Sequence, residues 1–160
     1  MKALRKLLII LLLFYFINGQ KGYSIDEFIF YLQEKEYYDI IQIVKYYFGD
    51  DVAIDFCKQL TNSSKCEDVV RYYMTTGSRP ITPKISFEDL LKEKKVSEYF
   101  IKEIYNLYKG VDKEDKFLIY IIVNSYDILI QKMEETQILT LIKKMILKKK
   151  ITTATQKIVY

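Results

Sequence analysis

Two cysteines, Cys57 and Cys66, are the residues whose type and spacing most directly indicate a specific chemistry. Each lies on the apolar stripe of a predicted helix, and a short turn separates the two helices, so their side chains can converge. In a chain with an export signal, this arrangement predicts a disulfide that contributes about 2 to 3 kcal/mol of stability. Two buried thiols are the alternative. A zinc site is not expected, because structural zinc takes four nitrogen or sulfur ligands and the chain has no histidine.

The turn between the cysteines contains the sequon Asn62-Ser63-Ser64. In an exported eukaryotic protein, Asn62 is a candidate for N-glycosylation on an exposed loop. An ordinary Asn-Ser connection between two helices explains the same residues equally well.

Catalytic constellations are hard to assemble from this composition. The chain has no histidine and only five glycines, and it contains neither GxGxxG nor GxxxxGK. Its acidic clusters lack the order of a calcium loop and mostly begin predicted helices, where we expect caps and solvated faces. These clusters are Glu34/Glu36, Asp50/Asp51/Asp55, Glu67/Asp68 and Asp112/Glu114/Asp115. We therefore expect no catalytic residue, no metal and no cofactor.

Residues 1–19 have the pattern of a secretory signal peptide. A basic start precedes an unbroken apolar run from Leu7 to Ile17, which is shorter than the roughly 20 residues that cross a membrane. Cleavage after Gly19 would leave Gln20 as the new N-terminus, and an uncleaved anchor is the alternative. We expect the mature chain to be secreted and extracellular.

Charge is distributed unevenly along the expected mature chain. Residues 20–135 hold 16 basic and 21 acidic side chains, a net charge of −5, whereas residues 136–160 hold six lysines and no acid. This asymmetry distinguishes the C-terminal end from the rest of the chain. No nucleic-acid partner is expected.

Apolar residues recur with helical spacing along nearly all of residues 20–150, and no alternation typical of strands persists. The sequence predicts an all-α, compact single domain of seven or eight short helices, including one disulfide-pinned helical hairpin. A flexible basic tail is expected at residues 151–160. The expected helix starts are Ser24 and Ser64 (capping boxes with Glu27 and Glu67), Asp50 or Asp51, Ser86, Ser97 and Asp112, and the expected ends are Gly49, Thr61–Ser63, Gly77 and Gly110.

The segment from Phe117 to Met133 contains the most apolar predicted helix. Its first two turns are apolar on all sides, which is typical of a central, buried helix. A small apolar ligand would bind against this helix, and the candidate contacts are Phe117, Tyr120, Ile121 and Tyr126. The chain has 15 Tyr and 9 Phe, and we expect most of them to form the core and its margin rather than a binding surface.

The last predicted helix runs from about Thr136 to Lys150 and has two distinct faces. One arc is apolar, and the opposite arc is basic except that Lys149 departs from it. The basic arc consists of Lys143, Lys144, Lys148 and Lys150. These lysines are candidates for contact with a membrane surface or an anionic partner. The alternative, which we favour, is that the apolar arc completes the core and the lysines stabilise the end of the helix.

The sequence as a whole predicts a secreted, non-catalytic helical binding protein. Its partner is expected to be an extracellular protein or a small apolar ligand. A membrane-surface-active protein that acts through the basic C-terminal helix is the alternative. The cysteine hairpin resembles the disulfide-pinned helical hairpins of saposin-like and insect odorant-binding proteins. Both families use more cysteines at other spacings, so no residue role follows from the resemblance.

Overall fold

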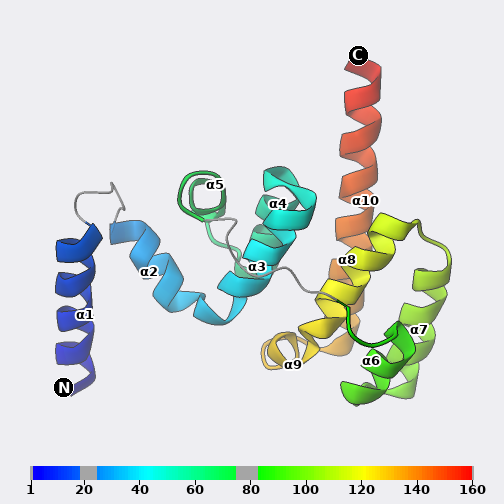
Figure 1. Cartoon of the computed structure of the whole chain (residues 1–160), viewed down its shortest axis with the longest axis horizontal. Coiled ribbons are helices and arrows are strands. Elements are labelled where there is room, and N and C mark those ends of the chain that lie inside the picture. Colours follow the sequence, from blue (N-terminus) through cyan, green and yellow to red (C-terminus); the bar gives the residue numbers. More distant parts are fainter. Residues whose placement is uncertain (1, 19–24, 75–82, 160) are drawn as a thin grey trace.

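The structure is a computed structural model that describes residues 2–18, 25–74 and 83–159 (Figure 1). Helices with short connections make up these residues and no strand occurs among them, which confirms the all-α prediction. In chain order the helices are α1 (Lys2–Asn18), α2 (Ile25–Gln33), α3 (Lys35–Phe48), α4 (Asp50–Thr61), α5 (Cys66–Asp68), the π-helical turn η1 (Val69–Tyr73), α6 (Phe87–Glu93), α7 (Glu98–Lys109), α8 (Lys113–Asn124), α9 (Tyr126–Leu129) and α10 (Glu135–Val159).

The predicted cap residues begin three of these helices. Ser86, Ser97 and Asp112 each accept a hydrogen bond from the backbone amide three residues later, at the starts of α6, α7 and α8. Gly49 separates α3 from α4 with a φ of 89°, a conformation that glycine adopts without strain. The predicted capping box at Ser24, the glycine end at Gly77 and the cleavage point after Gly19 fall outside the described residues.

The predicted capping box at Ser64 and Glu67 does not form. Lys65 precedes α5 without a side-chain cap, and the amide of Lys65 instead donates to Ser63 Oγ at 3.1 Å. Local side-chain bonds in the tight turn therefore take the place of the helix cap. The helix that starts here is also shorter than predicted, because Met74 is already extended after η1.

The predicted continuous helix from Phe117 to Met133 is wrong, because the chain turns at Ser125. The amide of Ser125 donates to Ile122 O at 3.1 Å, a tighter pattern than an α-helical bond. Asn124, Ser125 and Asp127 interrupt the apolar run, and such short polar side chains favour helix ends over helix interiors. The short helix α9 follows in a new direction.

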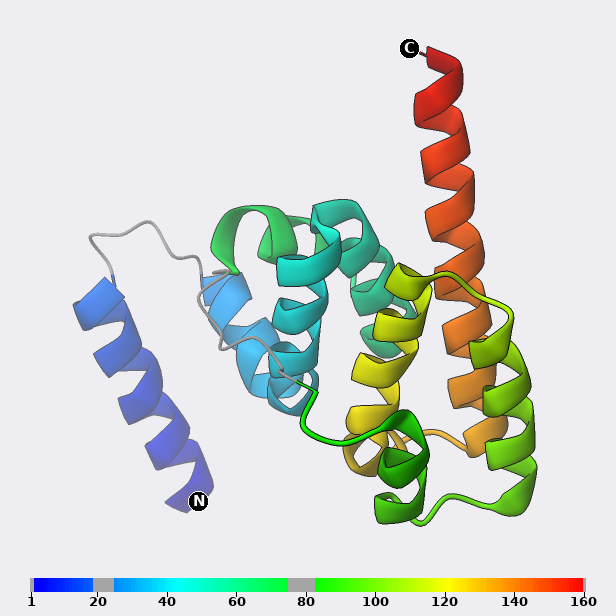
Figure 2. The ribbon, with the colours of Figure 1, turned by 45° about the vertical axis from the view of Figure 1, so that its right-hand side comes forward.

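α10 continues to Val159, past the predicted helix end at Lys150. Residues 151–159 contain no proline or glycine that would stop it. Figure 2 shows this end of α10 projecting beyond the other helices. The predicted boundary of a flexible tail at residue 151 therefore does not coincide with a helix end.

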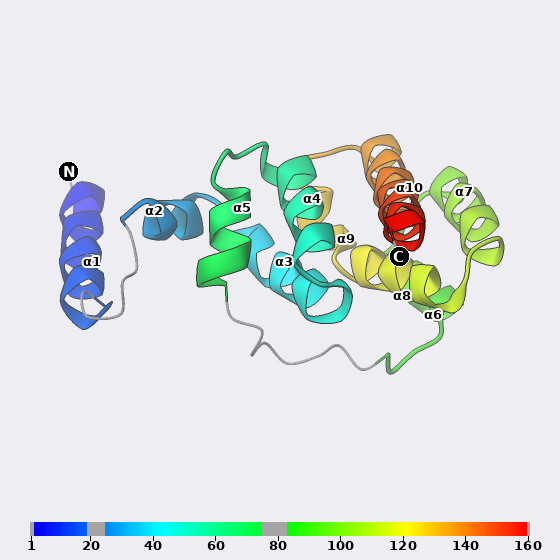
Figure 3. The same cartoon turned by 90° about the horizontal axis from the view of Figure 1, so that it is seen from above.

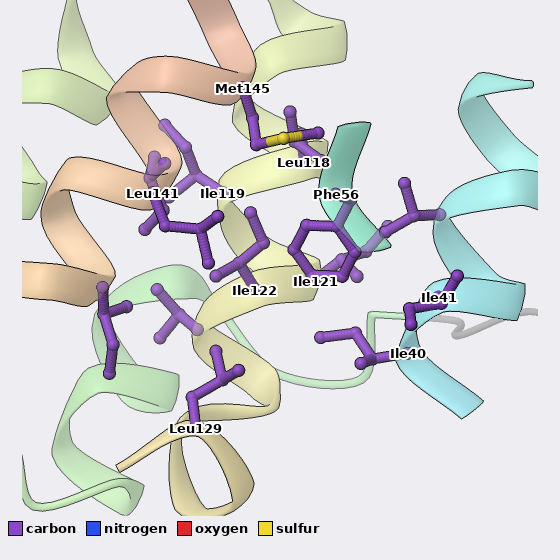
Figure 4. Close-up of a cluster of buried hydrophobic side chains, with 14 of the residues drawn as sticks. Ile40, Ile41, Phe56, Leu118, Ile119, Ile121, Ile122, Leu129, Leu141 and Met145 are labelled. Atoms are coloured by element: carbon purple, nitrogen blue, oxygen red, sulfur yellow. The ribbon is translucent and has the colours of Figure 1, made fainter. Parts of the chain in front are cut away.

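α8 is the central helix, as its apolar composition predicted. It packs against α3, α6, α7 and α10, and every residue from Leu118 to Val123 is buried. The close-up in Figure 4 shows four of them, Leu118, Ile119, Ile121 and Ile122, between Phe56 of α4, Ile40 and Ile41 of α3, and Leu141 and Met145 of α10. A single buried cluster thus joins the helices on both sides of residues 75–82.

α1 lies apart from this cluster, beyond α2 (Figure 3). Its described leucine and isoleucine side chains include several that are 39% to 66% exposed. Of the helices in the described ranges, none combines the length and the apolar content that a membrane span requires.

Candidate functional site

The disulfide between Cys57 and Cys66 is present and links α4 to α5. The two Cα atoms are 5.7 Å apart, and both cysteines are buried. Thr61 Oγ1 donates to the Cys57 carbonyl at 2.9 Å and lies 3.3 Å from Cys66 Sγ, so the turn folds over the bond. A bond that is buried and covered in this way stabilises the hairpin and is shielded from thiol exchange.

Asn62 lies at the tip of this hairpin. Its side chain is exposed, and its φ of 53° places the backbone in the left-handed region that often ends a helix. The amide of Asn62 donates to Lys58 O at 3.0 Å and so caps α4. Glycosylation of Asn62 remains a prediction.

The four predicted ligand contacts have different neighbours among the described residues, and their role in ligand binding stays a prediction. Ile121 lies in the core, whereas the Tyr120 hydroxyl donates to Ile85 O at 3.1 Å. Tyr126 packs edge-on against Phe100, with ring centroids 5.6 Å apart. Phe117 lines an open recess at the surface. The centre of α8 is therefore packed with protein side chains.

Tyr126 belongs to a polar cluster that joins three helix ends. Its hydroxyl donates to Glu135 Oε2 at 2.8 Å, and Ser97 Oγ donates to Glu135 Oε1 at 2.6 Å. Burial, together with the hydrogen bond to Glu135, raises the pKa of Tyr126 to about 12. Burial acts to raise the pKa of Glu135 as well, but hydrogen bonds from Ser97 and Tyr126 outweigh it and leave that pKa lowered. The cluster fixes the starts of α7, α9 and α10 relative to one another.

An open recess with aromatic walls lies where the end of α3, the start of α8 and the middle of α10 meet. It has a volume of about 530 Å³. The rings of Tyr47 and Phe117 meet edge-on at 4.7 Å, and Phe48 and Phe117 are 6.3 Å apart. The residues that line this aromatic recess are Tyr47, Phe48, Lys113, Glu114, Phe117 and Lys149. Aromatic side chains that are half-buried around an open hollow are typical of positions where proteins receive an apolar group.

Lys149 forms the charged border of the aromatic recess. Its Nζ lies 5.3 Å from the centre of the Phe48 ring, 2.9 Å from Glu114 Oε2 and 3.1 Å from Asp115 Oδ1. Burial lowers the pKa of Lys149, but its hydrogen bonds to the two carboxylates outweigh this effect and leave it raised, so Lys149 stays charged. Asp115 is buried rather than solvated, which corrects the prediction for this acidic cluster.

Asp112 in the same cluster is a helix cap, as predicted. Its Oδ1 accepts the amide of Asp115 at 2.8 Å. That backbone hydrogen bond lowers the pKa of Asp112, and the charge of Lys149 lowers it further. Burial acts in the opposite direction but is outweighed. In the described part of the chain, no three His, Cys, Asp or Glu side chains gather closely enough to hold a metal ion.

The two faces of α10 differ as the sequence predicted. The apolar arc is buried against the other helices, at residues Ile138, Leu139, Leu141, Ile142, Met145 and Ile146. Lys143, Lys144 and Lys150 are exposed. Lys148 is exposed too, but its Nζ lies 3.1 Å from Asp55 Oδ1. The apolar arc therefore closes the core, and the lysines face outward.

Lys45 is an important residue that the sequence analysis did not single out. Its side chain is only 10% exposed, and its Nζ donates to the carbonyls of Val70 and Met74 at the end of η1. Lys45 follows Ile41 by four residues and so falls on the buried stripe of α3, which is the signal that could have identified it. Lys149 gave the same signal, because it too falls on the apolar side of its helix.

Comparison of the chain with protein-family models, with curated proteins and with solved structures finds no match.

Proposed function

We propose that this protein is an exported, non-catalytic protein-binding module and that a partner protein inserts an apolar side chain into the aromatic recess. The observation that carries the proposal is the gathering of Tyr47, Phe48 and Phe117 around an open hollow. Interfaces are enriched in aromatic side chains, and their strongest contacts are anchors that enter such pockets.

A protein partner fits the geometry better than a carried apolar ligand. Binding sites for small apolar molecules bury most of the ligand surface inside a cleft or cavity. The described side chains around α8 are buried in one cluster, whereas the aromatic recess is open to the surface. A partner can therefore reach the recess without any opening of the fold.

Two features support export. The pattern of residues 1–19 is that of a signal peptide, and most of the described apolar side chains of α1 are exposed rather than packed on the core. The disulfide is typical of an oxidising compartment. We propose that α1 is removed and that the remaining chain acts outside the cell.

A glycan on Asn62 is compatible with this function. Asn62 follows the last residue of α4, whereas Phe48 of the recess directly precedes Gly49 at the other end of that helix. The 12 residues of α4 separate the two positions by about 18 Å at 1.5 Å per residue. A sugar at the hairpin tip would therefore leave the aromatic recess accessible.

Membrane-surface activity is less well supported. An amphipathic helix binds a membrane in proportion to the apolar area that it inserts. The apolar arc of α10 is buried in the core, so it is not free to enter a lipid surface without unfolding the protein.

The test is affinity enrichment from the extracellular fraction of cells that produce the protein. The bait is the tagged mature chain, compared with Phe117→Ala and with Tyr72→Ala as a matched control. Tyr72 is 74% exposed on η1 and does not line the recess. We expect one protein to be enriched by the native bait and by Tyr72→Ala, and to be lost with Phe117→Ala. Equal enrichment by all three baits would overturn the assignment of the recess, provided that circular dichroism shows each bait to be folded.

A further inference from the structure

The outward face of α10 carries two large aliphatic side chains that are more than half exposed. Leu147 is 59% exposed and Ile151 is 57% exposed. They are four residues apart and so lie one helical turn from each other. At about 100° per residue, both point away from the buried arc centred on Ile142 and Met145.

Exposed lysines flank this aliphatic pair on both sides. By the same helical geometry, Lys143 and Lys150 lie on one side of the pair and Lys144 lies on the other. We call the surface formed by Lys143, Lys144, Leu147, Lys150 and Ile151 the lysine face. No acidic residue occurs between positions 136 and 160, so the charge of this face is not compensated by its own helix.

Two neighbouring lysines of α10, Lys148 and Lys149, form ion pairs with other helices. Lys148 contacts Asp55, and Lys149 contacts Glu114 and Asp115. These contacts tie α10 to α4 and α8. They hold the helix in a fixed orientation on the body. Figure 2 shows α10 running beside the other helices and projecting beyond them at its C-terminal end.

We propose that the lysine face binds an acidic amphipathic helix of a partner protein. An aliphatic pair spaced by four residues is the pattern with which one helix packs against another, and charged residues beside the seam select the partner. The charged side chains of α10 beside the pair are all positive, and Lys150 also interacts with the charge of Asp112 at the start of α8. The complementary helix therefore carries Glu or Asp beside its own apolar stripe. This inference rests on the proposed protein-binding function, but it uses a different surface from the aromatic recess.

Two other occupants fit the surface less well. A second copy of the chain would place lysine against lysine across the seam, and like charges there destabilise pairing. A lipid surface would gain only two aliphatic side chains, and an anionic membrane would repel residues 20–135, whose net charge is −5. Charge complementarity therefore favours an acidic helix.

The test uses a synthetic probe. It is a fluorescent three-heptad peptide with Leu at the a and d positions and Glu at the e and g positions, and a control peptide has Lys in place of Glu. Fluorescence anisotropy measures binding to the mature protein with its disulfide intact, at low and at high salt. We expect the acidic peptide to bind, the basic peptide not to bind, and salt to weaken binding because exposed charges are screened.

Variants assign the binding to the lysine face. Leu147→Ala/Ile151→Ala and Lys143→Glu/Lys144→Glu/Lys150→Glu should each weaken binding by about tenfold or more. The matched control is Lys84→Glu/Lys92→Glu/Lys102→Glu, which makes the same change in charge at other exposed positions and should keep the native affinity. Phe117→Ala should also bind the acidic peptide with native affinity, because Phe117 lies in the aromatic recess and not on the lysine face. The experiment can therefore refute the lysine-face proposal independently of the proposed role of the aromatic recess.

Four results would overturn the proposal. The first is equal binding of the acidic and basic peptides, and the second is unchanged binding after the reversals on the lysine face. The third is a dimer in sedimentation experiments that Leu147→Ala/Ile151→Ala dissociates, because it would identify a second copy as the occupant. The fourth is binding to phosphatidylcholine–phosphatidylserine vesicles that the lysine reversals abolish, without binding of the peptide, because it would identify a lipid surface.

Discussion

Lys45 illustrates how a single charged side chain stabilises this fold. Its ammonium group donates to Val70 O within η1 and to Met74 O directly after η1, and it lies 3.8 Å from Asp50 Oδ1. Carbonyls at a helix end have no partner within the helix, so a donor from α3 takes that role. The contact also joins α3 to the disulfide-linked hairpin.

We expect Lys45→Met to lower the free energy of unfolding by about 1 to 3 kcal/mol, because it removes the donor to both carbonyls. Urea denaturation at neutral pH measures the change. Lys35→Met is the control, since Lys35 is exposed at the start of the same helix, and it should change stability by less than about 0.5 kcal/mol. Equal stability of the two variants would show that the Lys45 contacts contribute nothing.

Glu135 should make stability depend on pH in the acidic range. Its pKa in the folded protein is lowered from the ordinary value of 4.5. Burial acts to raise this pKa, but the hydrogen bonds from Ser97 and Tyr126 lower it by more. Because this pKa is lowered on folding, the ionised Glu135 stabilises the folded protein above pH 4.5. This stabilisation is lost as the pH falls through the pKa of the folded state.

Unfolding curves at a series of pH values should therefore separate native protein from Glu135→Gln. We expect the stability difference between them to be constant above about pH 5 and to shrink in more acidic solution. Glu93→Gln, at an exposed position, should follow the native curve. A difference between native protein and Glu135→Gln that grows as the pH falls would contradict the hydrogen-bonded carboxylate.

At the scale of elements, α10 is attached to the body by its buried arc and by the ion pair of Lys149 with Asp115. The Asp115 side chain is only 2% exposed, so its charge needs a partner within the protein. Lys149 supplies that charge at the border of the aromatic recess. The same pair thus anchors the helix and shapes the recess.

Adjacent lysines allow a matched comparison. Lys149→Met should destabilise the protein by about 3 kcal/mol, because it leaves the buried Asp115 carboxylate without its partner. Lys150→Met removes an exposed charge one residue later and should cost less than about 0.5 kcal/mol. Thermal and chemical denaturation of both variants check the prediction, and similar losses in the two would contradict it.

Sequence patterns predicted most of these elements, for physical reasons that the structure makes clear. The starts of α6, α7 and α8 follow from Ser86, Ser97 and Asp112, because a cap depends only on nearby residues. The apolar arc of α10 follows from helical periodicity. The break at Ser125 was missed because the apolar run around it outweighed the short polar residues Asn124, Ser125 and Asp127. The tight turn before α5 was missed because local side-chain bonds replace the expected helix cap.

At the scale of the whole molecule, the aromatic recess shows the limit of sequence reasoning. Phe117 was a predicted contact, but Tyr47 and Phe48 come from α3, about 70 positions earlier in the chain. Their proximity depends on the packing of α3 against α8. Periodicity identifies the buried stripe of each helix but not which stripes meet, so Tyr120, Ile121 and Tyr126 were grouped with Phe117 although they face other neighbours.

Export makes a prediction for the intact protein. Material recovered from the extracellular fraction should begin at Gln20, and its mass without reduction should be two hydrogens below that of the reduced chain, because of the disulfide. Intact-mass spectrometry before and after reduction measures both properties. Recovery of chains that retain Met1, or that hold two free thiols, would contradict export through an oxidising compartment.

The measurement that tests the central claim most directly is the dissociation constant of the enriched partner for three purified proteins, obtained by isothermal titration calorimetry. These are the native chain, Phe117→Ala and Tyr72→Ala. If the aromatic recess receives an anchor side chain, Phe117→Ala should weaken binding by about 30-fold, equivalent to about 2 kcal/mol, and Tyr72→Ala should change it by less than about twofold. Equal dissociation constants for Phe117→Ala and the native chain, with both proteins folded, would contradict the claim.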